Sequence, residues 1–163
     1  MARKVFFSFH FKNDCWRTGQ VRNIGVIEGN KPISDNDWEE VRKKGDREVE
    51  KWIDDQLKGK SCIVVLIGEK TADRKWIKYE IKKAWELKKG IVGIKVHNLK
   101  DSEGNQSYEG RNPFEDFKVG EKKLSSIVKV YNPAFKVSTN VYSHIEKNIE
   151  DWIEEAINIR QIQ

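Results

Sequence analysis

A run of mainly apolar positions begins near the start of the chain. Residues 4–11 are rich in β-branched and aromatic side chains, and such a run is typical of a strand covered on both faces. Side chains of a strand point alternately to its two faces. We therefore expect a first strand over 4–11, with Val5, Phe7 and Phe9 on one face and Phe6, Ser8 and His10 on the other.

Three later apolar runs also have strand character. Residues 62–67 read Cys-Ile-Val-Val-Leu-Ile, a continuous apolar run of strand length. Such a run suits a central parallel strand, because both faces of that strand are buried. Further strands are expected over 91–96 and 125–131.

Apolar residues at helical spacing predict three helices. The first covers about 38–57 behind the capping side chains of 34–37, with Gly45 as a weak point inside it. The second covers 73–89 and the third covers 139–160. The apolar positions that define these faces are Trp38, Val41, Val49, Trp52, Ile53 and Leu57, then Ile77, Ile81, Ala84 and Trp85, and finally Val141, Ile145, Ile149, Trp152, Ile153, Ala156 and Ile157.

Two long stretches between these elements lack a clear period. Residues 12–35 are rich in Asn and Gly and predict a loop, within which 21–26 favours a short helix or strand. Residues 98–121 form a second polar excursion that contains glycine. Long loops of compact domains are often functional, so both stretches are candidates for a role in binding.

The order of elements predicts the fold class. Strands and helices alternate along the chain, and this order favours a parallel sheet with helices on both faces. We expect an α/β, flavodoxin-like three-layer fold with a central, mainly parallel sheet. The sequence shows no internal repeat, low-complexity segment or linker, so residues 1–163 are expected to form a single domain.

Composition narrows the functional classes. Of the 163 residues, 35% are charged, and no apolar run approaches the length of a membrane span. The chain enters its first strand without an apolar signal region, so we expect a cytoplasmic protein with reduced cysteines and no membrane contact. The formal net charge is +5, but lysines alternate with acidic residues along the helices, as a solvated face does. We therefore expect no nucleic-acid partner, although the positive charge favours an anionic ligand such as a dinucleotide.

Several kinds of chemistry lack their sequence signatures. No glycine-rich phosphate loop is present, and no Gly-x-Ser-x-Gly elbow occurs. His10, His97 and His144 are far apart and lack ligand spacing to one another or to Cys15 and Cys62. We therefore expect no metal site.

The segment 74–81 carries the sharpest candidate chemistry. Trp76 and Glu80 are four residues apart, so on a helix their side chains lie on one face, one turn apart. This helix would follow the strand over 62–67, and ligands of open α/β sheets bind beside the carboxyl ends of the strands. A carboxylate there can accept hydrogen bonds from ribose hydroxyls and stabilise positive charge at the anomeric carbon. The same spacing also suits a surface glutamate with Trp76 as a buried helix anchor.

Four segments resemble TIR and TIR-like domains. Residues 5–10 are similar to the opening strand of that superfamily, and Trp-Ile-Lys-Tyr-Glu at 76–80 is similar to its Trp-Cys-x-x-Glu motif, with Ile77 in the cysteine position. Together with 62–68 and Gly-Arg-Asn-Pro-Phe at 110–114, these segments resemble the TIR-like component of the Thoeris anti-phage system. The C-terminal third is similar only in ending with a helix.

The resemblance implies an enzyme of bacterial anti-phage immunity that cleaves the nicotinamide–ribose bond of NAD. In Thoeris-like TIR proteins the ADP-ribosyl part is recyclised into a cyclic ADP-ribose isomer, which activates a partner effector. NAD would then be the substrate, and no resident cofactor is expected. Expected partners are NAD, further copies of the chain through self-association, and an effector that is reached through a diffusible nucleotide.

The resemblance also implies the site. Glu80 would be the catalytic carboxylate, Trp76 would shape the pocket wall, and the loop before Trp38 would be mobile over the nucleotide. The other substrate-binding candidates are Phe6, Ser8, His10, Asp35 and Asn112. By position alone, His10 at a strand end equally suits a structural histidine, Phe6 suits a core residue, and Asn112 before a proline suits a turn.

A second function remains open, because many TIR domains are non-catalytic interaction modules. In that case a Glu80→Gln protein would keep its biological output, whereas surface changes near Trp38 would abolish it. A phospho-receiver-like regulator is less compatible with the sequence, since it needs an acidic cluster at the strand ends. The predicted ends carry Ser8, His10, Gly68 and His97 instead.

Overall fold

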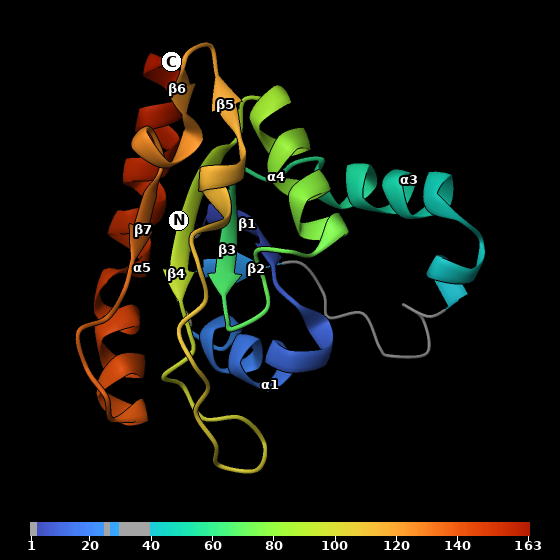
Figure 1. Cartoon of the computed structure of the whole chain (residues 1–163). Coiled ribbons are helices and arrows are strands. Elements are labelled where there is room, and N and C mark those ends of the chain that lie inside the picture. Colours follow the sequence, from blue (N-terminus) through green and yellow to red (C-terminus); the bar gives the residue numbers. More distant parts are fainter. Residues whose placement is uncertain (1–2, 25–26, 30–39) are drawn as a thin grey trace.

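A five-stranded parallel sheet forms the centre of the protein. The structure, a computed structural model, describes residues 3–24, 27–29 and 40–163. The strands lie in the order β2-β1-β3-β4-β7, and every neighbouring pair is parallel (Figure 1). This is the strand order of doubly wound, flavodoxin-like sheets, so the predicted α/β fold is confirmed. The strands are β1 (Arg3–Ser8), β2 (Ile27–Gly29), β3 (Cys62–Ile67), β4 (Gly90–Lys95) and β7 (Lys129–Tyr131).

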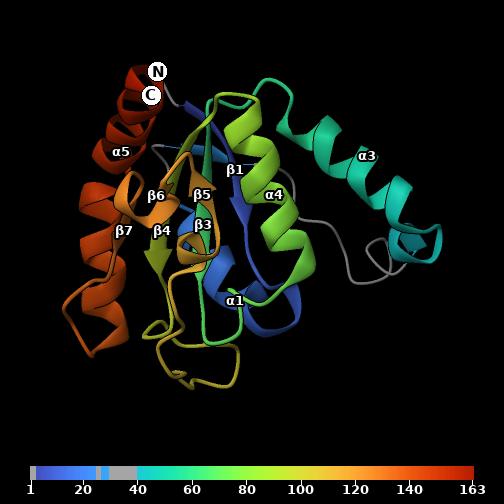
Figure 2. The ribbon, with the colours of Figure 1, turned by 45° about the horizontal axis from the view of Figure 1, so that its top comes forward.

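Helices cover both faces of this sheet. Figure 2 shows α5 on one side of the strands and α4 on the other. The helices are α1 (Phe11–Arg22), α3 (Asp46–Leu57), α4 (Lys75–Glu86) and α5 (Ser138–Ile162). Shorter elements follow β4, namely η1 (Pro113–Asp116), β5 (Lys118–Val119), β6 (Lys122–Lys123) and η2 (Leu124–Ser126). No helix in the described part of the chain is both long and apolar enough to cross a membrane.

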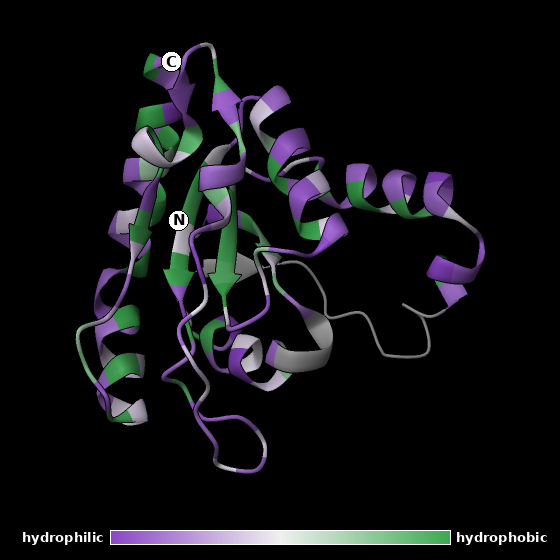
Figure 3. Cartoon of the chain, viewed as in Figure 1, coloured by the Kyte–Doolittle hydropathy of each residue, from purple (hydrophilic) through white to green (hydrophobic). Residues whose placement is uncertain are grey.

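Alternation along β1 divides the core into two layers. Val5 and Phe7 are buried with apolar side chains of α1 and α5, whereas Phe6 is buried with those of α3 and α4. Burying side chains of this size contributes about 1.5–3 kcal/mol each. β3 is buried along its whole length, as a central parallel strand should be. Figure 3 shows the same distribution, with apolar residues on the central strands and on the inner faces of the helices.

Close backbone contact fixes α5 against β4. A Cβ atom placed on Gly90 would lie 2.8 Å from the backbone nitrogen of Ile157 and 2.9 Å from the carbonyl carbon of Ala156. Only glycine fits this approach without movement of the helix, and α5 therefore packs directly on the first residue of β4.

The first half of the chain differs from the sequence prediction. The first strand ends at Ser8 rather than at residue 11, and residues 9–10 connect it directly to α1. The loop predicted over 12–35 is wrong for its first part, because 11–22 form a helix. The inward face of α1 includes Asp14, Arg17 and Thr18, so its sequence lacks the apolar period of an amphipathic helix. β2 lies just after the segment that was expected to hold a short element.

Two further elements are shorter than expected. The predicted helix over 38–57 is interrupted at Gly45, whose φ of 99° lies in the left-handed region that glycine adopts readily, and α3 begins after it. The N-terminal part of that prediction, including Trp38, lies outside the described residues. Of the strand predicted over 125–131, only the last three residues form β7, because η2 takes up the beginning. The single-domain assignment stays a prediction.

Candidate functional site

Glu80 lies in the second turn of α4, which runs back from the carboxyl end of β3. Its side chain is on the buried face of the helix together with Ile77 and Ile81, and only 7% of the residue is exposed. Trp76, one turn earlier, is half-buried. The alternative of an exposed glutamate beside a buried tryptophan anchor is therefore wrong, because the carboxyl group is the buried member of the pair.

Ser8 is the polar neighbour of this carboxyl group. It ends β1, is 1% exposed, and sits in register with Val65 of β3. Burial raises the pKa of Glu80 to about 8, and the nearby Ser8 hydroxyl lowers it only in part. Within the described residues, neither Glu80 Oε2 nor Ser8 Oγ has a hydrogen-bond partner of good geometry. The site thus holds a largely neutral carboxylic acid at pH 7 with capacity to bind a polar ligand group.

His10 and Phe6 lie on either side of Ser8 along the chain. His10 is half-buried and is the N-cap residue of α1, where its carbonyl oxygen accepts a hydrogen bond from Asp14 N–H at 2.8 Å. Phe6 is 2% exposed and packs in the core layer of α3 and α4. Phe6 is thus placed as a core residue and His10 at the carboxyl end of β1; their roles in substrate binding stay predictions.

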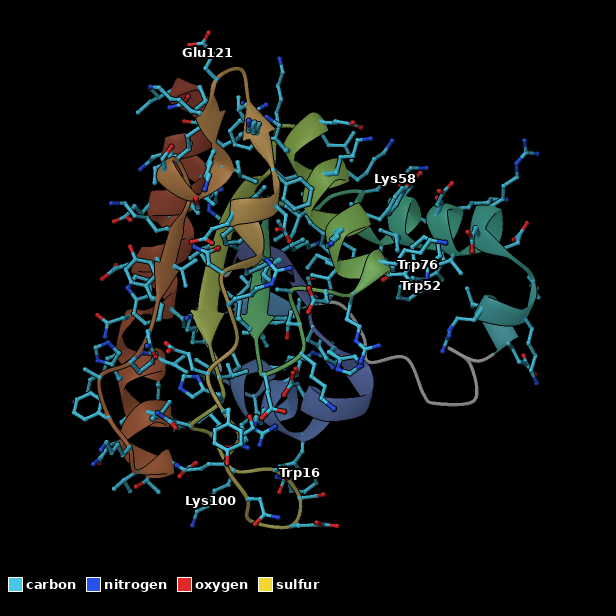
Figure 4. All side chains as sticks on the ribbon, in the orientation of Figure 1. Trp16, Trp52, Lys58, Trp76, Lys100 and Glu121 are labelled. Carbon is cyan, nitrogen blue, oxygen red and sulfur yellow. The ribbon has the colours of Figure 1, made fainter. Side chains whose placement is uncertain are left out.

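Trp76 lies where α4 meets α3. Its ring makes an edge contact with Tyr79 at 5.9 Å between centroids, and Lys75 Nζ lies 4.8 Å from its centroid. The Tyr79 hydroxyl donates to Asp54 Oδ1 of α3 at 2.9 Å, which joins the two helices. Trp76 and Trp52 of α3 both pack on the same core layer, and Figure 4 shows them at this junction.

Asn112 belongs to a segment that crosses the carboxyl end of β3. A Cβ atom on Gly110 would lie 2.0 Å from the carbonyl oxygen of Gly68, so the two backbones touch. The Asn112 side chain is engaged locally, since its Oδ1 accepts a hydrogen bond from Phe114 N–H at 2.8 Å and caps η1. Its turn-forming role is therefore observed, and its role in binding stays a prediction. Asp35 lies outside the described residues.

Sequence reasoning missed a buried ion pair on α1. Asp14 Oδ1 and Arg17 Nη1 are 3.0 Å apart, and their side chains are 1% and 4% exposed. Burial raises the pKa of Asp14, although the Arg17 guanidinium and the Thr71 hydroxyl both pull it down. A spacing of three residues would have suggested this pair only if residues 11–22 had been recognised as a helix.

Other reactive groups give little support for a metal or a thiol site. In residues 3–24, 27–29 and 40–163, no group of three or more His, Cys, Asp or Glu side chains is placed to hold a metal ion. Cys15 is exposed and Cys62 is buried, and burial raises the pKa of the Cys62 thiol. A buried thiol with a raised pKa is a poor nucleophile.

The parallel sheet and the buried acid on the helix after β3 agree with the expected TIR-like domain. Residues 6–101 match the family model of the Thoeris protein ThsB, TIR-like domain, and the chain belongs to that family. It is also 37% identical over 120 residues to ThsB1 of Bacillus cereus (strain MSX-D12), a protein provisionally named as a cyclic ADP-D-ribose synthase. The match covers 71% of this chain and 62% of that relative, so the chain spans about three fifths of the relative's length.

Proposed function

We propose that this protein is a TIR-like enzyme of anti-phage immunity that consumes NAD and produces a cyclic ADP-ribose-type nucleotide. The observation that carries the proposal is the buried carboxyl group of Glu80 beside Ser8, at the edge of the sheet where α/β folds bind ligands. The name of the Bacillus cereus relative supports the same product class. A buried acid with a strongly raised pKa, beside a hydroxyl rather than a cation, is characteristic of a functional site rather than of a stabilising ion pair.

The reaction would begin at the bond between the nicotinamide nitrogen and C1′ of its ribose. When this bond breaks, its electron pair stays on the nitrogen, which neutralises the pyridinium ring, and C1′ becomes an oxocarbenium centre. The ionised Glu80 carboxylate stabilises that positive charge. A ring nitrogen of adenine or a ribose hydroxyl then bonds to C1′ and closes the cycle, and a hydroxyl nucleophile would release its proton to the carboxylate.

The charge of the substrate explains how a neutral Glu80 becomes active. The nicotinamide ring of NAD is cationic, and a positive charge close to a carboxyl group favours its ionised form. Binding would therefore lower the pKa of Glu80, so that its proton passes to water and leaves the carboxylate that the bond cleavage needs. NAD is the substrate in this scheme, and no resident cofactor is proposed.

The other site residues have supporting roles in the proposal. Ser8 would bind a ribose hydroxyl, and Trp76 would limit the pocket at the junction of α3 and α4. The remaining candidates for contact with the nucleotide are Phe6, His10, Asp35 and Asn112. We place the reaction in the cytoplasm, where the product would diffuse to an effector, and we propose self-association as a route to activation.

A substitution that keeps the shape of Glu80 tests the proposal. Purified protein is incubated with NAD, and nicotinamide and cyclic products are separated and identified by mass spectrometry. Glu80→Gln should reduce nicotinamide release by about 100-fold or more. The control is Glu86→Gln, which removes an exposed carboxylate from the same helix and should leave the rate unchanged.

The same pair of variants is then expressed in cells challenged with phage, since assembly or infection can be needed for activity. Cyclic nucleotide should accumulate with wild-type protein and Glu86→Gln, but not with Glu80→Gln. Wild-type product levels from a folded Glu80→Gln protein would refute the catalytic role.

A non-catalytic interaction module is the second candidate. It is favoured by large side chains that a monomer leaves in water: Trp16 on α1 is 59% exposed and Tyr108 is 83% exposed. In that case, phage protection would survive in the Glu80→Gln protein and fail in a Trp16→Ala protein. The catalytic proposal predicts loss of protection in Glu80→Gln.

A further inference from the structure

A single buried guanidinium joins α1 to the loop that follows β4. Arg17 is 3% exposed, and its Nη1 is bound to Asp14 Oδ1 in the ion pair described above. Its Nε donates to the carbonyl oxygen of Leu99 at 2.7 Å, and its Nη2 donates to that of Asn105 at 3.0 Å. Both carbonyl groups belong to the polar stretch 98–121. Arg17 therefore binds two points of the same loop, at Leu99 and at Asn105.

The loop between these two carbonyl groups is itself ordered. Asp101 Oδ1 accepts hydrogen bonds from the backbone N–H groups of Glu103 and Asn105, each at 2.9 Å. The N–H group of Asp101 donates in turn to the Asn105 carbonyl at 2.9 Å. Asp101 Oδ2 lies 4.0 Å from Arg17 Nη2, which adds an ion pair to the arrangement. The turn is therefore preformed. Arg17 anchors it on the domain together with Gln20 Nε2, which donates to the Lys100 carbonyl at 2.7 Å, and Ser138 Oγ, which accepts from Lys100 N–H at 3.0 Å.

The continuation of the loop contacts the connection between β3 and α4, the helix that carries Glu80. Tyr108 N–H donates to Glu69 Oε1 at 3.1 Å, directly after β3. Gly110 then touches Gly68, and Arg111 Nη2 donates to Asp73 Oδ1 at 2.5 Å just before α4 begins. The segment 99–111 thus runs across the carboxyl edge of the sheet, from α1 to the start of α4 (Figure 1). Figure 4 shows Trp16 of α1 and Lys100 of the loop at this same end of the molecule.

We infer that Arg17 is a positioning residue for dinucleotide binding, because it holds the segment 99–111 in place along the binding edge. The inference rests on the proposed function, since it takes this edge as the NAD site. Lysine cannot replace Arg17 there, because its ammonium lacks the planar fork that serves Asp14, Leu99 and Asn105 together. Loss of this geometry should weaken NAD binding while leaving the chemistry at Glu80 largely intact.

The test measures NAD binding separately from turnover. Dissociation constants are determined calorimetrically in a Glu80→Gln background, and KM and kcat are determined in the protein with Glu80 intact. Arg17→Lys should raise the Kd and the KM for NAD by about tenfold, with kcat changed by less than about threefold. The matched control is Arg3→Lys, which makes the same replacement at the half-exposed pair of Arg3 with Glu154 and should change neither constant.

A second variant covers the case in which Arg17→Lys fails to fold. Asp101→Ala removes the acceptor that orders the loop, from a side chain that is partly exposed, and should raise the Kd and KM in the same direction. Hydrogen exchange should show faster exchange over 99–111 in either variant. Folded variants with wild-type Kd and KM overturn the inference.

The outcomes also separate the inference from the proposed function. Unchanged NAD affinity in both loop variants, with cleavage that depends on Glu80, removes the role of Arg17 alone. Weaker NAD binding in the loop variants, with full turnover in Glu80→Gln, removes the catalytic role of Glu80 alone. A protein that does not bind NAD under any condition contradicts both.

Discussion

Replacement of Glu80 by glutamine should change how the stability of the protein depends on pH. The pKa of Glu80 is raised by burial from 4.5 to about 8. A pKa difference of one between the folded and unfolded states corresponds to about 1.4 kcal/mol of unfolding free energy. The whole rise in the pKa of Glu80 therefore corresponds to at most about 5 kcal/mol. This value is large compared with the total stability of a domain of this size, which is typically about 5–15 kcal/mol.

The sign of the effect follows from proton binding in the two states. Between pH 4.5 and about 8 the folded protein keeps the proton on Glu80, whereas the unfolded chain has released it. The folded state then binds more protons, and the free energy of unfolding must fall as the pH rises through this window. The stability that the bound proton on Glu80 contributes is fully present below pH 4.5 and is lost above about pH 8.

Glutamine keeps the shape of the side chain but does not titrate. Glu80→Gln should therefore resemble the wild type near pH 5 and be more stable by about 3–5 kcal/mol near pH 8.5. Urea unfolding followed by tryptophan fluorescence from pH 5 to pH 9 measures this difference, and other titrating groups cancel in it. Glu86→Gln serves as the control, since this exposed side chain lies on the same helix. A constant difference between wild type and Glu80→Gln over the whole range would refute the raised pKa of the buried carboxyl group.

Three simpler substitutions test a hydrogen bond, a close backbone contact and the helix α1. Tyr79→Phe removes the hydrogen bond to Asp54 and should lower the free energy of unfolding by about 1 kcal/mol in urea titrations, whereas no change would mean that α3 and α4 do not depend on it. Gly110→Ala forces a Cβ atom to within 2.0 Å of the Gly68 carbonyl and should lower the melting temperature clearly; an unchanged value would contradict this close approach. Gly19→Ala, at a helical position where the new Cβ would meet no atom within 4 Å other than its chain neighbours and the nearby helix backbone, should instead stabilise the protein by up to about 1 kcal/mol, and a loss of stability would contradict the described helix α1.

The centre of the fold and the position of Glu80 were predictable from the sequence. The run 62–67 is apolar throughout, which left a buried parallel strand as its natural structure, and helical spacing from Ile77 to Ala84 fixed the face of α4. Alternation along β1 correctly placed Ser8 on the same side as Phe6 and α4. These features depend on local periods, and local periods are readable without knowledge of the tertiary structure.

The parts that were missed depend on tertiary contacts. α1 buries Asp14, Arg17 and Thr18, and the charge of Arg17 is acceptable inside because Asp14 on the same helix and two carbonyl groups of a distant segment bind it. No apolar period marks such a helix, and its partners follow some 80 residues later. The break at Gly45 was visible as a weak point, but whether a glycine interrupts a helix depends on what the flanking segments pack against.

The sequence also did not predict that the loop after β4 is ordered by hydrogen bonds. Its composition of glycine, asparagine and acidic residues is that of any solvent-exposed connection. Part of its order comes from the local hydrogen bonds of Asp101, and part comes from Arg17, whose hydrogen bonds form only when α1 and the loop are brought together. The polar composition correctly predicted an irregular backbone over 98–112, missed η1 and β5 in the rest of the stretch, and gave no information on rigidity.

The two-residue link between β1 and α1 limits how this domain can diversify. Because only two residues separate β1 from α1, a movement of Ser8 or of the start of α1 would also move a central strand. Variation in ligand choice among related chains should therefore accumulate in the long connection after β4, where residues can be added or removed at the surface. An engineer who wants a new nucleotide specificity would randomise that connection and leave the first link intact.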